Sequence, residues 1–145
     1  LFEGVALNHG RGTDFPFTII GGPMLKEKYS FSFTPVSKPG MAEDPVFQDQ
    51  VCYGLDLRNY DLEKLVKSKK INLSWMIELY NNHPNKDKFF DRSISRQIGN
   101  IDFLIGDGEF KKQLAAGWSE QQIRKTWEPG ISSYKKMREK YLLYP

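Results

Sequence analysis

The 145-residue sequence has a single cysteine, Cys52, and only two histidines, His9 and His83. One cysteine excludes an intrachain disulfide framework. The two histidines lie far apart, so no Cys/His cluster has the spacing of zinc ligands. The sequence therefore predicts no metal site and no cofactor, and it indicates neither an oxidising nor a reducing compartment.

Long apolar runs are also missing, because no segment approaches the roughly 20 residues that a membrane helix needs. The hydrophobic fraction of 39% and the aromatic fraction of 14% argue against disorder and against a coiled coil. A chain of this length can bury roughly 70% of its unfolded surface. We therefore expect a soluble globular chain in which residues 1–145 form a single domain.

A large excess of one charge is absent, since 21 basic and 18 acidic residues leave a net charge of +3. This is too little for the electrostatic footprint of a nucleic-acid-binding domain, which stays only a third alternative. Two short basic runs alternate with apolar residues, which favours solvated helix faces. They are Lys67, Lys69 and Lys70, and Lys135, Lys136, Arg138 and Lys140.

The chain opens at Leu1 with neither an initiator methionine nor an export signal, so we expect a processed or excised piece of a longer protein.

The first half has the pattern of short strands and long loops. Apolar runs interrupted by glycine predict a strand before a loop at residues 8–16, and a second strand at Phe17–Ile20. Alternating aromatic and polar residues predict a strand at Tyr29–Thr34. A long loop over 37–50 and a strand at Val51–Arg58 follow, with Gly54 expected to mark a bulge.

The second half is typical of helices. Asp61 can cap a short helix, and apolar residues at helical spacing predict a longer one over 72–82. A further helix should end at Gly117, and Ser119 with Gln122 forms a capping box for the next one.

Pro129-Gly130 is expected to break the chain before a last helix whose stripe is Tyr134, Met137, Arg138 and Tyr141. Strands followed by helices, without regular alternation, predict an α+β fold.

One segment carries more polar chemistry than a structural loop needs. Glu3, His9, Arg11, Thr13 and Asp14 lie within a dozen residues, among glycines that let a ligand approach the backbone. Carboxylates suit acid-base chemistry or sugar hydroxyls, and an arginine fork suits a carboxylate. Composition alone favours the alternative of a structural loop in which Arg11 pairs with Asp14 or Glu3 and Thr13 caps a turn.

Other reactive residue types have simpler interpretations. His9, with no evident partner, is typical of a surface or turn residue, and His83 of a structural residue at a helix end. Cys52 is expected in the core, and the Gly106–Glu109 segment in a turn that leads into a helix. Trp75 and Trp127 adjoin helix stripes and suit the core, whereas Trp118 could also stack on a sugar ring.

Several motifs, in order along nearly the whole chain, resemble those of the DUF1343 family of YbbC-like proteins. The first part of the chain carries Leu1-Phe2-Glu3-Gly4, Gly10-Arg11-Gly12-Thr13-Asp14, Pro16-Phe17 and Ile20-Gly21-Gly22-Pro23. Later motifs are Phe33-Thr34-Pro35, Cys52-Tyr53-Gly54-Leu55, Asp102-Phe103-Leu104-Ile105-Gly106 and Tyr141-Leu142-Leu143-Tyr144. The family includes the NamZ-type exo-β-N-acetylmuramidases of peptidoglycan turnover.

The resemblance implies that this chain is the C-terminal half of a two-domain protein whose N-terminal Rossmann-like domain is absent here. The family's Pro-Glu-His-Gly motif, taken to carry the catalytic glutamate, has no counterpart in this sequence. The residues that carry over, as this domain's wall of the sugar cleft, are Glu3, Arg11, Gly12, Thr13 and Asp14. Glu3 or Asp14 is a candidate second carboxylate, and the catalytic residues themselves stay unknown.

The implied function is substrate binding within an enzyme that releases terminal N-acetylmuramic acid from the non-reducing ends of peptidoglycan fragments or muropeptides. The implied partners are this glycan and the missing N-terminal domain, and the implied location is periplasmic, extracellular or associated with the cell wall. A noncatalytic glycan-binding domain and a purely structural domain are the alternatives. Where many relatives have Thr-Asn, this chain has Val5-Ala6, and Asn8 and His9 replace a serine and an acidic residue.

Overall fold

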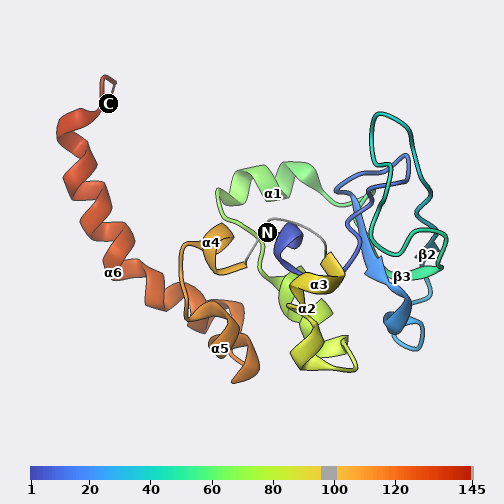
Figure 1. The fold of residues 1–145 in the computed structure, drawn as a ribbon. Helices are drawn as coiled ribbons and strands as arrows, with labels where there is room; N and C mark the ends of the chain where they lie inside the picture. The colour runs from blue at the N-terminus through green and yellow to red at the C-terminus, as the bar shows by residue number, and fades with distance from the viewer. Residues whose placement is uncertain (96–100, 145) are drawn as a thin grey trace.

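The computed structural model describes residues 1–95 and 101–144. It is an α+β structure in which a small sheet and long loops occupy one side and the helices the other (Figure 1). The strands are β1 (Ile19–Gly22), β2 (Ser32–Phe33) and β3 (Cys52–Asp56). The helices are α1 (Leu62–Ser68), α2 (Ser74–Asn82), α3 (Arg92–Ser95), α4 (Ile101–Ile105), α5 (Phe110–Ala115) and α6 (Glu120–Arg138). Single 3-10 turns are η1 (Phe2–Gly4), η2 (Pro23–Leu25), η3 (Lys86–Lys88) and η4 (Glu139–Tyr141).

The sheet is antiparallel, with β3 between β1 and β2. Gly21 and Gly54 face each other in the regular register of β1 and β3, so the bulge expected at Gly54 is wrong. A Cβ atom on Gly54 would lie 2.0 Å from the carbonyl oxygen of Ile20, and one on Gly21 would lie 2.2 Å from that of Tyr53. Glycine at both positions therefore lets the two backbones pair at this point.

The expected strands lie close to the observed ones, with two corrections. β1 starts at Ile19 instead of Phe17, because Phe17 has a left-handed backbone with φ of 64° that ends a turn. The strand expected before residue 8 is wrong: η1 occupies Phe2–Gly4, and Asn8 forms only an isolated bridge with Gly21.

The helix-end residues act as the sequence predicts. The Asp61 carboxylate accepts a hydrogen bond from the Lys64 amide at the start of α1. Ser119 and Gln122 form the capping box of α6, and Gly117 has φ of 72°, the left-handed conformation that suits glycine after a helix.

The break predicted at Pro129-Gly130 is wrong, because α6 continues through both residues. A proline in a helix removes the hydrogen bond to the carbonyl four residues earlier, here that of Lys125, and its ring crowds that carbonyl. Both Lys125 and Pro129 are exposed, so water can satisfy that carbonyl. The second half of α6 then projects from the body of the molecule (Figure 1).

One hydrophobic core joins the start of the chain, the sheet and the first parts of the helices. Its buried members are Val5, Leu7, Ile20, Leu25, Leu73, Met76, Leu79, Tyr80, Phe89, Ile101, Phe110, Leu114 and Ile123. Trp127 is partly buried against this core. Both basic runs are exposed on helices or just beyond them. Among the described residues, no helix combines the length and the hydropathy needed to cross a bilayer.

Candidate functional site

The Asn8 side chain holds the loop of residues 8–18 in shape. Its amide nitrogen donates to the carbonyl oxygens of Arg11, at 3.1 Å, and of Val46, at 2.8 Å. Its side-chain oxygen accepts from the Gly10 amide at 2.7 Å. Asn8 is buried, so these bonds replace water that the loop cannot reach. The residue ties the loop both to itself and to a segment almost forty positions away.

The two glycines of the loop are required by its geometry. Gly10 and Gly12 have φ of 85° and 82°, which side-chain-bearing residues rarely adopt. A Cβ on Gly12 would lie 2.7 Å from both the Pro45 side chain and the Val36 carbonyl. The loop therefore packs closely against residues 36–45.

Thr13 and Asp14 make the contacts of a structural loop. The Thr13 hydroxyl donates to the Gly10 carbonyl at 2.7 Å and accepts from the Phe15 amide at 3.0 Å. Asp14 forms an ion pair with Lys38, and not with Arg11. Lys38 has no local sequence signal that could have identified it as this partner, because the contact spans 24 residues.

Arg11 and Glu3 keep their charged groups available. Arg11 is exposed, and within residues 1–95 and 101–144 neither side chain makes an ion pair or a hydrogen bond. Glu3 is half-buried in η1. Both charges lie close enough to His9 to act on its pKa, which Glu3 raises and Arg11 lowers.

His9 is buried, so the expectation of a surface or turn residue is wrong for its exposure. Its ring stacks on Phe17 at 5.2 Å, and within the described chain neither ring nitrogen has a hydrogen-bond partner. Burial lowers the pKa of His9; the carboxylate of Glu3 opposes this shift and the guanidinium of Arg11 adds to it. The imidazole is therefore neutral near pH 7.

Arg11 borders a small cavity of about 240 Å³. Its lining combines two cations with apolar surface: Arg11, Gly12, Thr13, Pro16, Phe17, Lys38, Met41 and Ala42. Phe17 and Met41 are 61% and 65% exposed, so they add accessible apolar surface to this cavity. Such a site can hold a small group that has both a methyl and a carboxylate.

A second cavity of about 380 Å³ shares Gly12, Thr13 and Lys38 with the first. Asp14, Phe15, Phe31, Lys38 and Arg58 contribute to it. Arg58 is held by Asp56 through bonds of 2.8 and 2.6 Å and lies over the Phe15 ring at 4.5 Å. The cations of this cavity are therefore already paired with carboxylates, unlike Arg11.

Cys52 and His83 are buried, as expected for structural residues. Burial raises the pKa of the Cys52 thiol to about 12, which makes it a poor nucleophile. The Nδ1 atom of His83 accepts from the Asn85 amide at 3.2 Å. In the described part of the chain, no three His, Cys, Asp or Glu residues are grouped as metal ligands would be.

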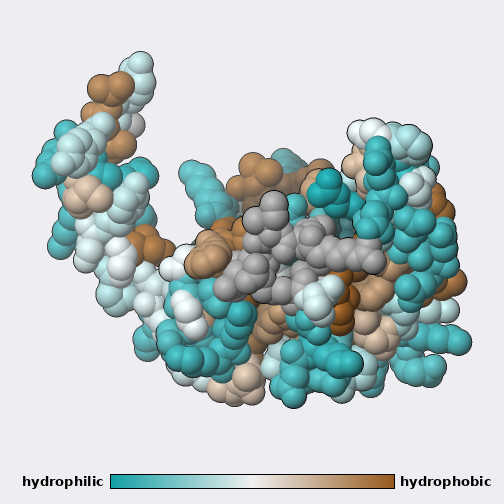
Figure 2. Space-filling view, viewed as in Figure 1, coloured by the Kyte–Doolittle hydropathy of each residue, from teal (hydrophilic) through white to brown (hydrophobic). Residues whose placement is uncertain are grey.

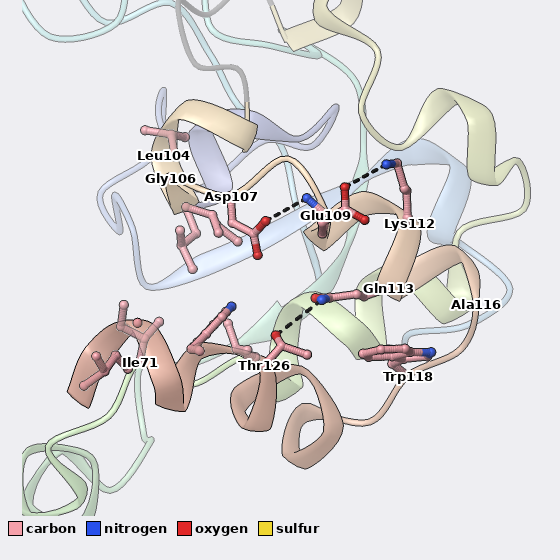
Figure 3. A pocket seen from close by; sticks show the side chains of 16 residues that line it. Ile71, Leu104, Gly106, Asp107, Glu109, Lys112, Gln113, Ala116, Trp118 and Thr126 are labelled. Atoms are coloured by element: carbon pink, nitrogen blue, oxygen red, sulfur yellow. Dashed lines mark hydrogen bonds and ion pairs between the residues drawn. The ribbon is translucent and has the colours of Figure 1, made fainter. Parts of the chain in front are cut away.

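A cavity of about 890 Å³ lies between α4, α5 and α6 (Figure 3). Asp107 turns the chain into α5, since its carboxylate accepts from the Glu109 amide at 2.8 Å. Trp118 and Trp127 line the cavity together with Leu104, Ile105 and Ile131. The lining is mainly apolar, which suits protein contacts better than a sugar.

Comparison with known proteins identifies the family. A model described as "Exo-beta-N-acetylmuramidase NamZ, C-terminal" matches residues 1–144. The chain belongs to the NamZ C-terminal family. A solved DUF1343 family protein from Bacteroides fragilis is 34% identical, with a TM-score of 0.85 over 99% of this chain. The peptidoglycan beta-N-acetylmuramidase NamZ of Bacillus subtilis is 28% identical over 99% of this chain.

This NamZ C-terminal chain spans little more than a third of the relatives it matches, 35% of the Bacillus subtilis protein and 38% of the Bacteroides fragilis chain. The family resemblance deduced from the motifs is therefore confirmed, and so is the α+β fold.

Proposed function

We propose that this chain is the C-terminal domain of a two-domain exo-β-N-acetylmuramidase and that residues 8–18 bind the terminal N-acetylmuramic acid of a peptidoglycan fragment. The observation that carries the proposal is Arg11, an exposed guanidinium without a protein partner beside an apolar cavity. The name of the Bacillus subtilis relative, a peptidoglycan beta-N-acetylmuramidase, supports the substrate class. By the same argument, the protein acts at the cell wall.

The lactyl group of muramic acid consists of a methyl and a carboxylate, and it distinguishes this sugar from N-acetylglucosamine. Arg11 can bind the carboxylate with its planar fork, while Phe17 and Met41 cover the methyl. Binding of N-acetylglucosamine would leave the guanidinium without its partner. The cavity thus gives a physical basis for selecting the muramide.

The two carboxylates of the site differ in their availability. Glycoside hydrolysis commonly uses two carboxyl groups on either side of the scissile bond. Asp14 is bound to Lys38, whereas Glu3 has no protein partner in the described chain. We therefore assign to Glu3 the role of orienting the sugar or acting as the second carboxylate, and to the N-terminal domain the general acid.

Arg11→Ala in the parent two-domain protein is the direct test. We expect turnover of a chromogenic muramide to fall about a hundred-fold, since one charge-assisted contact with substrate is lost, while the melting temperature stays unchanged. Lys67→Ala, which removes an exposed cation on α1, is the matched control and should keep full activity. Full activity of folded Arg11→Ala would support a structural domain instead.

Arg11→Lys tests the specificity separately, because it keeps the charge but loses the planar fork. Its turnover of the muramide should fall more than its turnover of the matching glucosaminide. An equal loss for both sugars would mean that Arg11 organises the loop and does not contact the lactyl group.

The isolated chain should release no N-acetylmuramic acid, because it lacks the domain to which we assign the general acid. Calorimetric titration of residues 1–145 with muropeptides distinguishes a half-site, which binds weakly, from an independent glycan-binding domain. Tight binding would favour the second.

A further inference from the structure

Helix α6 has an apolar face of which only the first half is covered. Ile123 is fully buried and Trp127 packs against the core. Beyond Pro129 the large apolar side chains are exposed, at 48% for Ile131, 57% for Tyr134, 47% for Met137 and 68% for Tyr141. We call residues 130–144 the arm and these four side chains the arm stripe.

The arm stripe continues the buried face of the same helix. From Ile123 to Met137 the spacings are four, four, three and three residues, which keeps these side chains on one side of α6, a helix with 3.6 residues per turn. Tyr141 follows four residues later, in η4. A stripe of this kind normally packs against another element. Figure 2 shows instead an open hollow between the arm and the rest of the molecule.

The start of the arm stripe borders the large apolar cavity described above. Leu1 and Ile131 both line that cavity, so the first residue and the start of the arm stripe share one surface. The matched family model is a C-terminal one, and the relatives are almost three times as long as this chain.

We infer that the arm stripe and this cavity form the docking surface for the N-terminal domain of the parent polypeptide. The inference rests on the two-domain architecture proposed above, but not on the glycan that the loop binds. The exposed Lys135 and Arg138 lie beside the stripe, so the facing surface of the N-terminal domain should be apolar at its centre and acidic at its rim.

Hydrogen exchange measured by mass spectrometry tests this inference. The amides of residues 131–144 should exchange at least ten-fold more slowly in the parent protein than in residues 1–145 alone, because docking covers the arm. The experiment reads no activity, so a failure of the glycan proposal would leave its result intact.

A pair of variants on the arm sharpens the test. Tyr134→Glu places a charge on the stripe, whereas Lys136→Glu lies roughly 200° around the helix. In the parent protein, Tyr134→Glu should abolish the protection of the arm and Lys136→Glu should keep most of it. Both positions are exposed in residues 1–145, so both variants of that chain should melt as the wild type does.

Three results would overturn the inference. The arm could exchange equally fast in the parent protein and in residues 1–145. Its protection could rise with the concentration of residues 1–145, which would indicate a second copy of the chain. It could also appear only with vesicles of anionic phospholipid, which would indicate a membrane surface.

Discussion

The loop of residues 8–18 and the arm both reach into solvent, but different forces fix their shapes. Asn8 and Thr13 hold the loop by hydrogen bonds to the backbone, and left-handed glycines bring it close to neighbouring segments. The arm is held up to Arg138 by the internal hydrogen bonds of α6, and its apolar stripe is uncovered among the residues that the structure describes. A braced polar loop is suited to a small ligand, and an uncovered apolar helix to another protein surface.

If the loop depends on its tight turns, adding one methyl group should damage it. Gly12→Ala should destabilise residues 1–145 by roughly 2–4 kcal/mol, since a left-handed alanine is strained and its Cβ meets Val36 and Pro45. Urea denaturation measures the effect.

Gly108→Ala is the matched control on the helical side. Gly108 has no atom within 4 Å of an added Cβ and no positive φ, so the change should stay within about 0.5 kcal/mol. If Gly12→Ala and Gly108→Ala lowered the stability equally, the loop would be no more sensitive to an added methyl group than the helical side.

The loop should also respond to acid through His9. Because burial lowers the pKa of His9, the unfolded state takes up the proton first as the pH falls below about 6.5. The contribution of neutral His9 is therefore present at pH 7.5 and is lost progressively towards pH 5.

Denaturation of wild type and of His9→Gln at both pH values measures this contribution. The wild type should lose more stability on acidification than His9→Gln. Burial also lowers the pKa of His83, so some acid sensitivity should remain in the variant. Identical acid sensitivity in the two proteins would place the effect elsewhere.

The smallest expected effect is on the arm. Gly130→Ala fills open space within α6 and should favour the helix by about 0.5–1 kcal/mol. In residues 1–145, exchange of the arm amides should slow about four-fold, while the urea midpoint of the whole chain should barely change. A shift of the midpoint as large as that of Gly12→Ala would show that the arm unfolds together with the body.

Sequence patterns located features that depend on neighbouring residues. Helix α2, the Asp61 cap and the Ser119 capping box follow from residues within one or two turns. The motif that contains Arg11 marked the candidate loop for the same reason. The break expected at Pro129 failed because a proline removes one hydrogen bond while the turns on either side of it persist.

Features that depend on distant residues were not predictable. The pairing of Asp14 with Lys38 and the contact of Asn8 with Val46 join segments 24 and 38 residues apart. The burial of His9 depends on Phe17 folding back over its ring. Asn8, the residue that shapes the loop, was seen only as a departure from the family pattern.

The position of the arm in the chain has a consequence for biosynthesis. Residues 130–144 leave the ribosome after every other described element, and after the preceding domain of any longer parent. At roughly 5–20 residues per second, domains generally fold as units during synthesis, with the N-terminal one first. The arm stripe would then emerge when the N-terminal domain on which we infer that it docks is already folded. Nascent chains would expose it to wrong partners for only a short time.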